Sequence, residues 1–481
     1  MKISMLIGGK AVEAEGGRTY DRHDPVTGEI ATQAPAASVA DALRAVAAAH
    51  AAFPAWAATA PGQRRAILNK AADKLDAMTP DIIAGGIAET GATGPWLGFN
   101  CKLGGDILRE VAAMTTQITG DVIPSNKPGC LSMAIRRPLG VCLGIAPWNA
   151  PVILGVRAVA MAIACGNTVV FKASELSPFI HRAIGDALTE AGLPDGVINV
   201  ITNAPEDAGE IVAALIAAPE VKHVNFTGST RVGRIIAMKA AEHLKPALLE
   251  LGGKAPLVVL DDADLEGAVN AAAFGAFMNQ GQICMSTERI IVHEGIADAF
   301  VAALAAKAGA LPYGDPREKV VLGALITPEA AEKMDRIIGD AKAKGGKVVA
   351  GGARDGSVVA ATLIDNVSDD MTIYQEESFG PVKPIIRVAN DDEAVRVAND
   401  TEYGLSAAVF SRDIRRAMAV AERIESGICH INGPTVSDEA QMPFGGVKNS
   451  GYGRFGGKAA LDAFTLTRWI TIEDPDQHYP F

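Results

Sequence analysis

The residues Gly140-Val141-Cys142-Leu143-Gly144-Ile145 begin the part of the chain that decides its fold class. From about 139 to 250, short apolar runs rich in β-forming residues alternate with helical segments. The apolar runs lie at 139–146, 167–172, 197–202, 222–226 and 246–250, and the helical segments at about 153–164, 176–191, 206–217 and 229–243. This alternation predicts an α/β fold with a parallel sheet, and such sheets bind ligands at the carboxyl ends of their strands. A dinucleotide is the first candidate ligand.

The rest of the chain extends this pattern in both directions. Residues 1 to about 35 are predicted to form short hairpins. Alanine-rich helices fill about 38–116, with starts predicted at Ser38, Thr59-Ala60-Pro61 and Thr79-Pro80-Asp81. A second α/β block runs from Leu257 to about 460, so that a boundary between blocks falls near Gly252-Gly253. The pattern at 464–472 predicts one more strand, which can offer its edge to a partner.

Composition excludes several classes of protein. The chain has 481 residues, of which 49% are hydrophobic and 21% charged, as expected for a globular protein of two or three domains. The net charge is −12 and basic residues occur singly or in pairs, which argues against nucleic-acid binding. The six cysteines show no paired spacing, so we expect neither disulfides nor a cysteine-based zinc site, and a cytoplasmic location fits best.

Residues 138–171 resemble a membrane span on hydropathy alone, because Arg157 is their only charge. Pro147, Asn149 and Pro151 interrupt the segment. A buried strand, a loop and a packed helix therefore explain it better, and no membrane association is expected.

Three residues are candidates for acyl chemistry. Cys284 is flanked by glycine and small polar residues, so its sulfur could face a cleft as a nucleophile. Glu250 could serve as its base, and Asn149, held between two prolines, could donate an N–H to an oxyanion. Two of them also have an ordinary alternative: a lone cysteine is usually a small buried hydrophobe, and asparagine between prolines is a common turn former.

Two segments suggest a cofactor site. Residues 226–233 lie where a strand ends and a helix begins, so Ser229 and the free amides could bind a pyrophosphate, although a serine-capped helix has the same pattern. Lys172 and Glu175 end the second strand, where a carboxylate would bind a ribose diol and repel a 2′-phosphate; surface charges are the alternative. The glycine-rich stretch 451–456 follows no clear strand of a βαβ unit, so we interpret it as a loop.

Taken together, these motifs resemble the NAD(P)-dependent aldehyde dehydrogenase superfamily across essentially the whole chain. The motifs, in chain order, are Pro147-Trp148-Asn149, Lys172 with Glu175, residues 226–230, residues 250–254, residues 281–284, residues 377–381 and residues 443–448. The resemblance implies a variant Rossmann cofactor domain (1–117 and 138–250), an α/β catalytic domain (251–460) and a small β oligomerisation domain (118–137 and 461–481). It also implies a homodimer or homotetramer.

The resemblance assigns roles to individual residues. Cys284 would be the nucleophile, Glu250 the base that activates the deacylating water, and Asn149 part of the oxyanion hole. The implied cofactor residues are Ile145, Ala146, Pro147, Trp148, Lys172, Ser174, Glu175, Gly209, Phe226, Thr227, Gly228, Ser229, Val232, Gly233, Leu251, Gly252, Glu377 and Phe379. The implied substrate residues are Trp96, Arg157, Ile283, Phe444 and Tyr452. Because Trp96, Phe444 and Tyr452 lie in or near motif loops, we expect them to line an apolar funnel for a flat ring; for Trp96 and Tyr452, ordinary packing is the alternative.

The motifs around Asn149 and Tyr452 look most like the aromatic branch of the superfamily, such as salicylaldehyde, vanillin and benzaldehyde dehydrogenases of aromatic hydrocarbon catabolism. The chain departs from the family pattern at Phe455, where many members carry glutamate, and at Pro205, where many carry glycine.

From the resemblance we expect NAD-dependent oxidation of an aromatic aldehyde through a thiohemiacetal and a thioester, with NADP less favoured and no metal. The alternatives are an aliphatic or semialdehyde dehydrogenase, a coenzyme A-acylating enzyme and a non-catalytic ligand-binding relative.

Overall fold

The computed structural model describes residues 1–476 and 479–481, and its N-terminal half is built on a parallel sheet. The five predicted strands are β7 (Val141–Ile145), β8 (Thr168–Lys172), β9 (Ile198–Ile201), β10 (Val221–Thr227) and β11 (Ala247–Glu250). They lie in the order β9-β8-β7-β10-β11, and each neighbouring pair is parallel. The predicted α/β class is confirmed. The chain order reverses between β7 and β10, the position at which open α/β sheets bind ligands.

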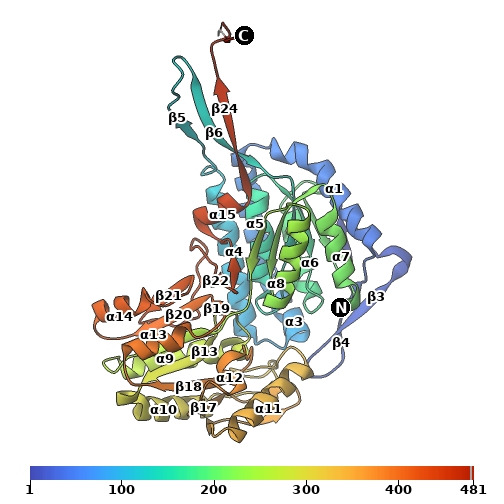
Figure 1. Ribbon diagram of the computed structural model, residues 1–481. Helices are drawn as coiled ribbons and strands as arrows, with labels where there is room; N and C mark the ends of the chain where they lie inside the picture. Colours follow the sequence, from blue (N-terminus) through green and yellow to red (C-terminus); the bar gives the residue numbers. More distant parts are fainter. Residues whose placement is uncertain (477–478) are drawn as a thin grey trace.

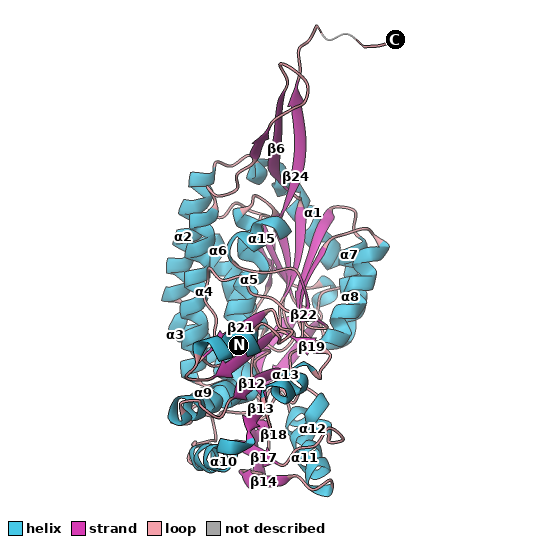
Figure 2. Ribbon diagram, turned by 60° about the vertical axis from the view of Figure 1, so that its left-hand side comes forward, coloured by secondary structure: helices cyan, strands magenta, loops and turns pink. Residues whose placement is uncertain are grey.

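Helices cover both faces of this sheet (Figures 1 and 2). One face packs against α5 (Pro151–Ala164) and α6 (Pro178–Glu190), which α2 (Pro61–Ala77) and α4 (Gly94–Met114) cover as a second layer, with α3 (Thr79–Thr90) beside them. The other face packs against α1 (Val39–Ala57), α7 (Ala208–Ala217) and α8 (Thr230–Glu242). The predicted helix starts at Ser38, Pro61 and Thr79 are confirmed. At Ser38 the hydroxyl accepts from the Asp41 amide while the Asp41 carboxylate accepts from the Ser38 amide.

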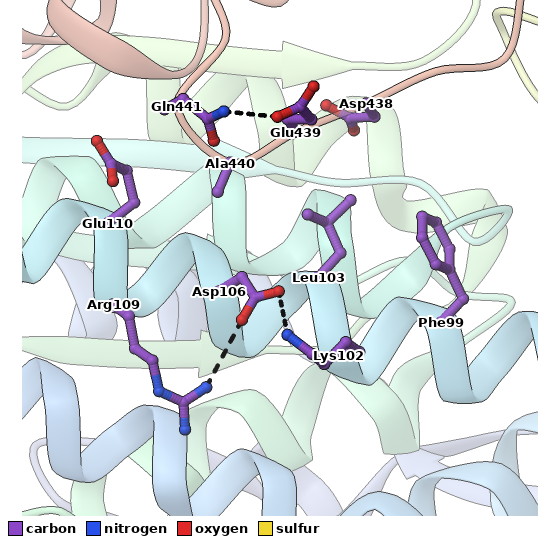
Figure 3. Close-up of a pocket in the computed structure, with 10 residues that line it drawn as sticks. All are labelled: Phe99, Lys102, Leu103, Asp106, Arg109, Glu110, Asp438, Glu439, Ala440 and Gln441. Carbon is purple, nitrogen blue, oxygen red and sulfur yellow. Dashed lines mark hydrogen bonds and ion pairs between the residues drawn. The ribbon is translucent and has the colours of Figure 1, made fainter.

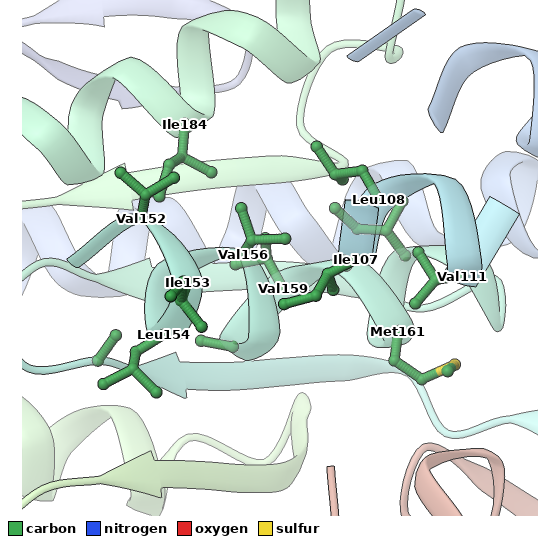
Figure 4. Close-up of a cluster of buried hydrophobic side chains, with 14 of the residues drawn as sticks. Ile107, Leu108, Val111, Val152, Ile153, Leu154, Val156, Val159, Met161 and Ile184 are labelled. Atoms are coloured by element: carbon green, nitrogen blue, oxygen red, sulfur yellow. The ribbon is translucent and has the colours of Figure 1, made fainter. Parts of the chain in front are cut away.

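Helix α5 explains the membrane-like hydropathy of residues 138–171. All of its residues are buried, because it lies between the sheet and α4. Figure 4 shows Ile107, Leu108 and Val111 of α4 beside Val156 and Val159 of α5. Within the described residues, no helix is both long enough and apolar enough to cross a membrane.

Two hairpins precede these helices, as predicted. Strands β1 (Met5–Ile7) and β2 (Lys10–Val12) are joined by Gly8 and Gly9, which both have positive φ, and β1 extends the sheet antiparallel to β9. Strands β3 (Thr19–His23) and β4 (Ile30–Pro35) form the second hairpin.

The second half contains its own mostly parallel sheet, in the order β14-β17-β18-β13-β12-β20-β21. Its strands are β12 (Ala255–Val259), β13 (Thr287–His293), β14 (Lys347–Ala350), β17 (Thr362–Asp365), β18 (Val382–Val388), β20 (Ser406–Phe410) and β21 (Ile428–Ile431). One face packs against α9 (Leu265–Phe277) and α10 (Glu294–Gly309). The other packs against α11 (Pro328–Ala343), α12 (Thr372–Gln375), α13 (Asp391–Asn399) and α14 (Ile414–Ala421). Minor strands are β15 (Arg354–Asp355), β16 (Val358–Val359), β19 (Tyr403–Gly404), β22 (Val447–Lys448) and β23 (Gly451–Tyr452).

A third, antiparallel sheet projects away from the other two (Figures 1 and 2). After α15 (Gly457–Ala463), strand β24 (Thr465–Ile472) pairs along its whole length with β6 (Leu131–Pro138), which also pairs with β5 (Asp121–Ile123). The predicted C-terminal strand is confirmed. Large apolar side chains on this sheet are exposed, including Val122, Leu131 and Trp469, the last of which is 74% exposed.

Candidate active site

Cys284 lies in a turn between α9 and β13, and the backbone of this turn is unusual. Asn279 and Gln280 have positive φ values of 48° and 56°, which non-glycine residues rarely adopt. A Cβ atom at Gly281 would lie 2.3 Å from the carbonyl oxygen of Gly380, so only glycine fits there. This turn leaves the Cys284 side chain half-buried at the wall of a cavity.

Asn149 is tied to the Cys284 turn from the loop between β7 and α5. Its side-chain amide donates to the Gln282 carbonyl at 2.9 Å. Its own carbonyl accepts from Asn279 Nδ2 at 3.0 Å and from Trp96 Nε1 at 2.9 Å. Asn149 and Cys284 therefore face the same cavity, as the sequence predicts.

Glu250 ends β11, and its carboxylate is buried at 2% exposure. Neither carboxylate oxygen has a hydrogen-bond partner among the described residues. A Cβ atom at Gly445 would lie 2.8 Å from Oε1, so the glycine makes room for the carboxylate. Burial raises the pKa of Glu250 to about 8, against the lowering effect of Arg157 and Arg454.

The pKa of the Cys284 thiol is raised above its ordinary value, chiefly by burial and further by the carboxylates of Glu250 and Glu377. Arg157 acts in the opposite direction. Cys284 and Glu250 are thus close enough to influence each other electrostatically, although Glu250 does not itself line the cavity among the described residues.

The cavity at Cys284, which we call the inner cavity, has a volume of about 380 Å³. Its described lining residues are Trp96, Phe99, Asn149, Ala150, Ile153, Leu154, Arg157, Phe274, Met278, Ile283, Cys284, Met285, Val436, Ser437, Asp438 and Phe444. Four of the five substrate residues that the resemblance implies, Trp96, Arg157, Ile283 and Phe444, are among them. The aromatic and aliphatic majority makes the cavity suitable for a flat apolar ring.

The prediction for Tyr452 is wrong. It lies in β23, which pairs antiparallel with β11 so that Tyr452 faces Leu249 in register, and its side chain is 51% exposed instead of lining the inner cavity. Its place near the motif loops misled the prediction, because the glycines on either side of Tyr452, Gly451 and Gly453, both have positive φ and redirect the backbone.

Sequence analysis missed other residues of the inner cavity, notably Phe99, Phe274 and Asp438. Phe99 lies one helical turn after Trp96 on α4, and its ring stacks on that of Trp96 at 5.7 Å. This spacing of three residues could have identified it. Asp438 carries no comparable signal in the sequence.

A second cavity of about 530 Å³ lies at the carboxyl ends of the parallel strands. Thirteen of the predicted cofactor residues line it together: Ile145, Ala146, Pro147, Trp148, Lys172, Ser174, Glu175, Gly209, Phe226, Thr227, Gly228, Ser229 and Val232. Since Trp148 lines this cavity and Asn149 lines the inner one, the two cavities are adjacent.

Two features of the second cavity suit a dinucleotide. The Ser229 hydroxyl caps α8 by accepting from the Val232 amide at 3.4 Å, which places a helix N-terminus at the cavity. Glu175 forms an ion pair with Lys172 and accepts from Asn203 Nδ2 at 2.8 Å. Burial alone would raise the pKa of Glu175, but the charge and hydrogen bond of Lys172 lower it overall, so the carboxylate is ionised.

The remaining predicted cofactor residues, Gly233, Leu251, Gly252, Glu377 and Phe379, lie outside the described lining of the second cavity. Gly233 allows close packing of Leu251, since a Cβ atom would approach that side chain to 2.3 Å. A Cβ atom at Gly252 would lie 3.1 Å from Glu377 Oε2.

Glu377 and Phe379 lie between Trp148 of the second cavity and the segment that follows Glu250. Glu377 accepts from the Gly253 amide at 2.9 Å, and burial raises its pKa to about 7. The Phe379 ring packs edge-on against Trp148, with ring centroids 5.7 Å apart. This segment therefore adjoins both the second cavity, through Trp148, and the Glu250 region, through Gly253.

A buried ion network supports this segment and was not predicted. Glu288 accepts from Lys254 Nζ at 2.9 Å, from Lys383 Nζ at 2.5 Å and from the amide and hydroxyl of Ser378 at 2.7 and 2.6 Å. Although burial opposes ionisation, the two lysines lower the pKa of Glu288 to about 2. The network anchors Ser378, between Glu377 and Phe379.

Comparison with known proteins gives consistent matches over the full chain. The model of the aldehyde dehydrogenase family matches residues 11–470. Vanillin dehydrogenase of Pseudomonas sp. (strain HR199 / DSM 7063) is 60% identical over 479 residues, covering 99% of both chains. Salicylaldehyde dehydrogenase of Pseudomonas sp. (strain C18) is 49% identical over 483 residues, covering 100% of both. The crystal structure of a salicylaldehyde dehydrogenase from Pseudomonas putida G7 complexed with salicylaldehyde superposes with a TM-score of 0.98 at 49% identity, covering 100% of each chain.

Proposed function

Because the chain belongs to the aldehyde dehydrogenase family, we propose that it oxidises an aromatic aldehyde to the carboxylate with NAD as the hydride acceptor. The observation that carries this proposal is the inner cavity, where Cys284 and Asn149 meet a wall of aromatic and aliphatic side chains. The predicted similarity to aromatic aldehyde dehydrogenases is confirmed, since relatives named for vanillin and salicylaldehyde match over the full length. A role in aromatic catabolism follows from the proposed substrate.

In the proposed mechanism Glu250 takes the proton of the Cys284 thiol and releases it to water, and the resulting thiolate attacks the aldehyde carbon. The second N–H of the Asn149 side chain and the backbone amide of Cys284 donate to the resulting oxyanion of the thiohemiacetal. When it is bound, NAD is the hydride acceptor of the reaction. Glu250 then takes a proton from water, which hydrolyses the thioester; its pKa of about 8 suits a base that works near neutral pH.

The second cavity fits NAD better than NADP. The amides at the N-terminus of α8 and the Ser229 hydroxyl would bind the pyrophosphate, and Lys172 with Glu175 would bind the adenosine ribose. An ionised Glu175 would repel a 2′-phosphate at the same position. Glu377 and Phe379, beyond Trp148, would contact the nicotinamide end.

We assign residues 1–117 and 138–250 to the cofactor domain, 251–460 to the catalytic domain, and 118–137 with 461–481 to an oligomerisation domain. The exposed apolar side chains of the β5-β6-β24 sheet support a homodimer or homotetramer built through that sheet. A Trp469→Glu variant should dissociate in size-exclusion chromatography with light scattering; an unchanged mass would contradict this assignment. The six free cysteines support a cytoplasmic location.

The function is tested by initial rates of NADH formation with benzaldehyde, salicylaldehyde, vanillin, succinic semialdehyde and acetaldehyde. We expect kcat/KM for the aromatic aldehydes to lead by about 100-fold, equivalent to about 2.7 kcal/mol of differential transition-state binding. The matched control is Cys284→Ala, which should form no NADH. If acetaldehyde or succinic semialdehyde leads, the aromatic assignment is wrong. If the wild type and the variant are equally inactive, the catalytic proposal fails.

A further inference from the structure

The inner cavity contains a buried ion pair that the mechanism above does not use. Arg157 Nη2 donates to Asp438 Oδ1 at 2.5 Å, and the two side chains are only 4% and 9% exposed. The Arg157 guanidinium also lies over the Phe444 ring, 4.3 Å from its centroid. Arg157 is therefore held on two sides, by an anion and by an aromatic face.

Arg157 and Asp438 are the only charged side chains among the described residues that line the inner cavity. Their formal charges cancel, so the pair adds no net charge to the cavity wall. Without Asp438, Arg157 would be a cation in an apolar enclosure, where attraction for an anion is several times stronger than in water. The guanidinium would then form a receptor for a carboxylate.

Asp438 also borders a second hollow. This hollow of about 480 Å³, which we call the outer cavity, shares Phe99 and Asp438 with the inner cavity. Figure 3 shows the outer cavity between α4 and the segment 438–441. We take the wall that the two cavities share, at Phe99 and Asp438, as the entrance of the inner cavity.

The outer cavity gives no compensating attraction for anions. Its cations are already paired: Lys102 contacts Asp106, and Arg109 Nη2 donates to Asp76 at 2.5 Å. Glu110 and Glu439 add two more carboxylates to the described lining. An anionic aldehyde would therefore meet negative charge at the entrance and a neutralised arginine inside.

We propose that Asp438 selects substrates by their charge. Because it neutralises Arg157 at the entrance of the inner cavity, uncharged aromatic aldehydes are accepted and aldehydes that carry a carboxylate are rejected. This inference rests on the proposed function and narrows its substrate class to neutral aldehydes. Rejection comes from the neutralisation of Arg157, which is the one cation among the described residues that line the inner cavity, in addition to repulsion by Asp438 itself.

The test compares kcat/KM for benzaldehyde with that for 3- and 4-carboxybenzaldehyde in the wild type and in Asp438→Asn. Asparagine keeps the size of the side chain but removes its charge. We expect the ratio of carboxylated to neutral substrate to rise at least tenfold. Asp438→Glu keeps the charge and should retain the wild-type ratio, as should Glu439→Gln, which changes a carboxylate of the outer cavity alone. An unchanged ratio in Asp438→Asn, or an equal rise in Glu439→Gln, would overturn the proposal.

A binding measurement separates this proposal from the proposed function. The dissociation constants of benzoate and of neutral benzamide are measured by isothermal titration calorimetry, which requires no turnover. Asp438→Asn should bind benzoate at least tenfold more tightly than the wild type does, with little change for benzamide. Equal benzoate affinity in the two proteins refutes charge selection by Asp438, even if aromatic aldehydes are oxidised. Tighter benzoate binding by Asp438→Asn supports charge selection by Asp438, even if the panel of aldehydes identifies another substrate.

Discussion

Replacing Glu250 by glutamine is expected to stabilise the folded chain while removing the proposed base. The wild-type carboxylate is buried at 2% exposure, and its oxygens have no hydrogen-bond partner among the described residues. Ionising such a group costs free energy, because water no longer solvates the charge. Glutamine has nearly the same shape and never ionises, so the variant avoids this cost at every pH.

The size of the effect follows from proton linkage. Burial raises the pKa of Glu250 from 4.5 to about 8, so between these pH values the folded state keeps a proton that the unfolded state has released. The free energy of unfolding of the wild type therefore falls with rising pH across this window, by about 1.4 kcal/mol per pH unit. The full loss is about 5 kcal/mol, and it is complete above pH 8. Below pH 4.5 the carboxyl is protonated in both states and contributes no difference.

The measurement is the melting temperature of the wild type and of Glu250→Gln by calorimetry from pH 5 to pH 9. The melting temperatures of the two proteins should nearly coincide at pH 5 and differ by several degrees at pH 9, where the variant is the more stable. Glu332→Gln, an exposed residue of α11, is the matched control and should follow the wild type. A variant that is no more stable than the wild type at pH 9, or a gap that does not widen with pH, would refute the reasoning.

Three further outcomes are expected. Asn149→Ala should lower kcat by about 100-fold or more with little change in the dissociation constant for NAD, because an oxyanion donor acts on the transition state; an equal loss of cofactor affinity would contradict that role. Glu288→Gln should lower the melting temperature by several degrees, since Lys254 and Lys383 lose a buried anionic partner and such losses cost about 3–5 kcal/mol. Glu175→Gln should raise kcat/KM for NADP relative to NAD about tenfold or more, and a constant ratio would exclude charge repulsion as the cause of cofactor preference.

Local signals were sufficient to predict most of the fold. Each β-rich run between 139 and 250 became a strand, because an apolar segment of four to eight residues flanked by helices has few other ways to bury both faces. The helix start at Ser38 could be predicted because serine is a preferred helix cap, and the structure adds that Asp41 completes the cap three residues later. The motif residues at the strand ends also line one cavity together, as expected, because the carboxyl ends of parallel strands meet at one edge of the sheet.

Contacts between distant residues could not be predicted in this way. Asp438 meets Arg157 across 281 positions of the chain, and neither position has a local pattern that indicates a partner. The prediction for Tyr452 failed for a related reason. It lies only eight residues after Phe444, but the intervening turn directs it to the edge of the other sheet.

The buried carboxylates of the site differ in pKa because their charged and hydrogen-bonding neighbours differ. Glu288, Glu377 and Glu250 are all buried, and burial raises the pKa of each. For Glu288 the charges of two lysines outweigh the effect of burial, and its pKa falls to about 2. Glu288 is therefore a permanent anion, which can anchor a segment but cannot accept a proton near neutral pH. Glu377 accepts one backbone amide and has a pKa of about 7, whereas Glu250 has no hydrogen-bond partner in the described chain and reaches about 8. Glu250 and Glu377 therefore both have a proton affinity that suits a base near neutral pH, and both raise the pKa of the Cys284 thiol, Glu250 more strongly than Glu377.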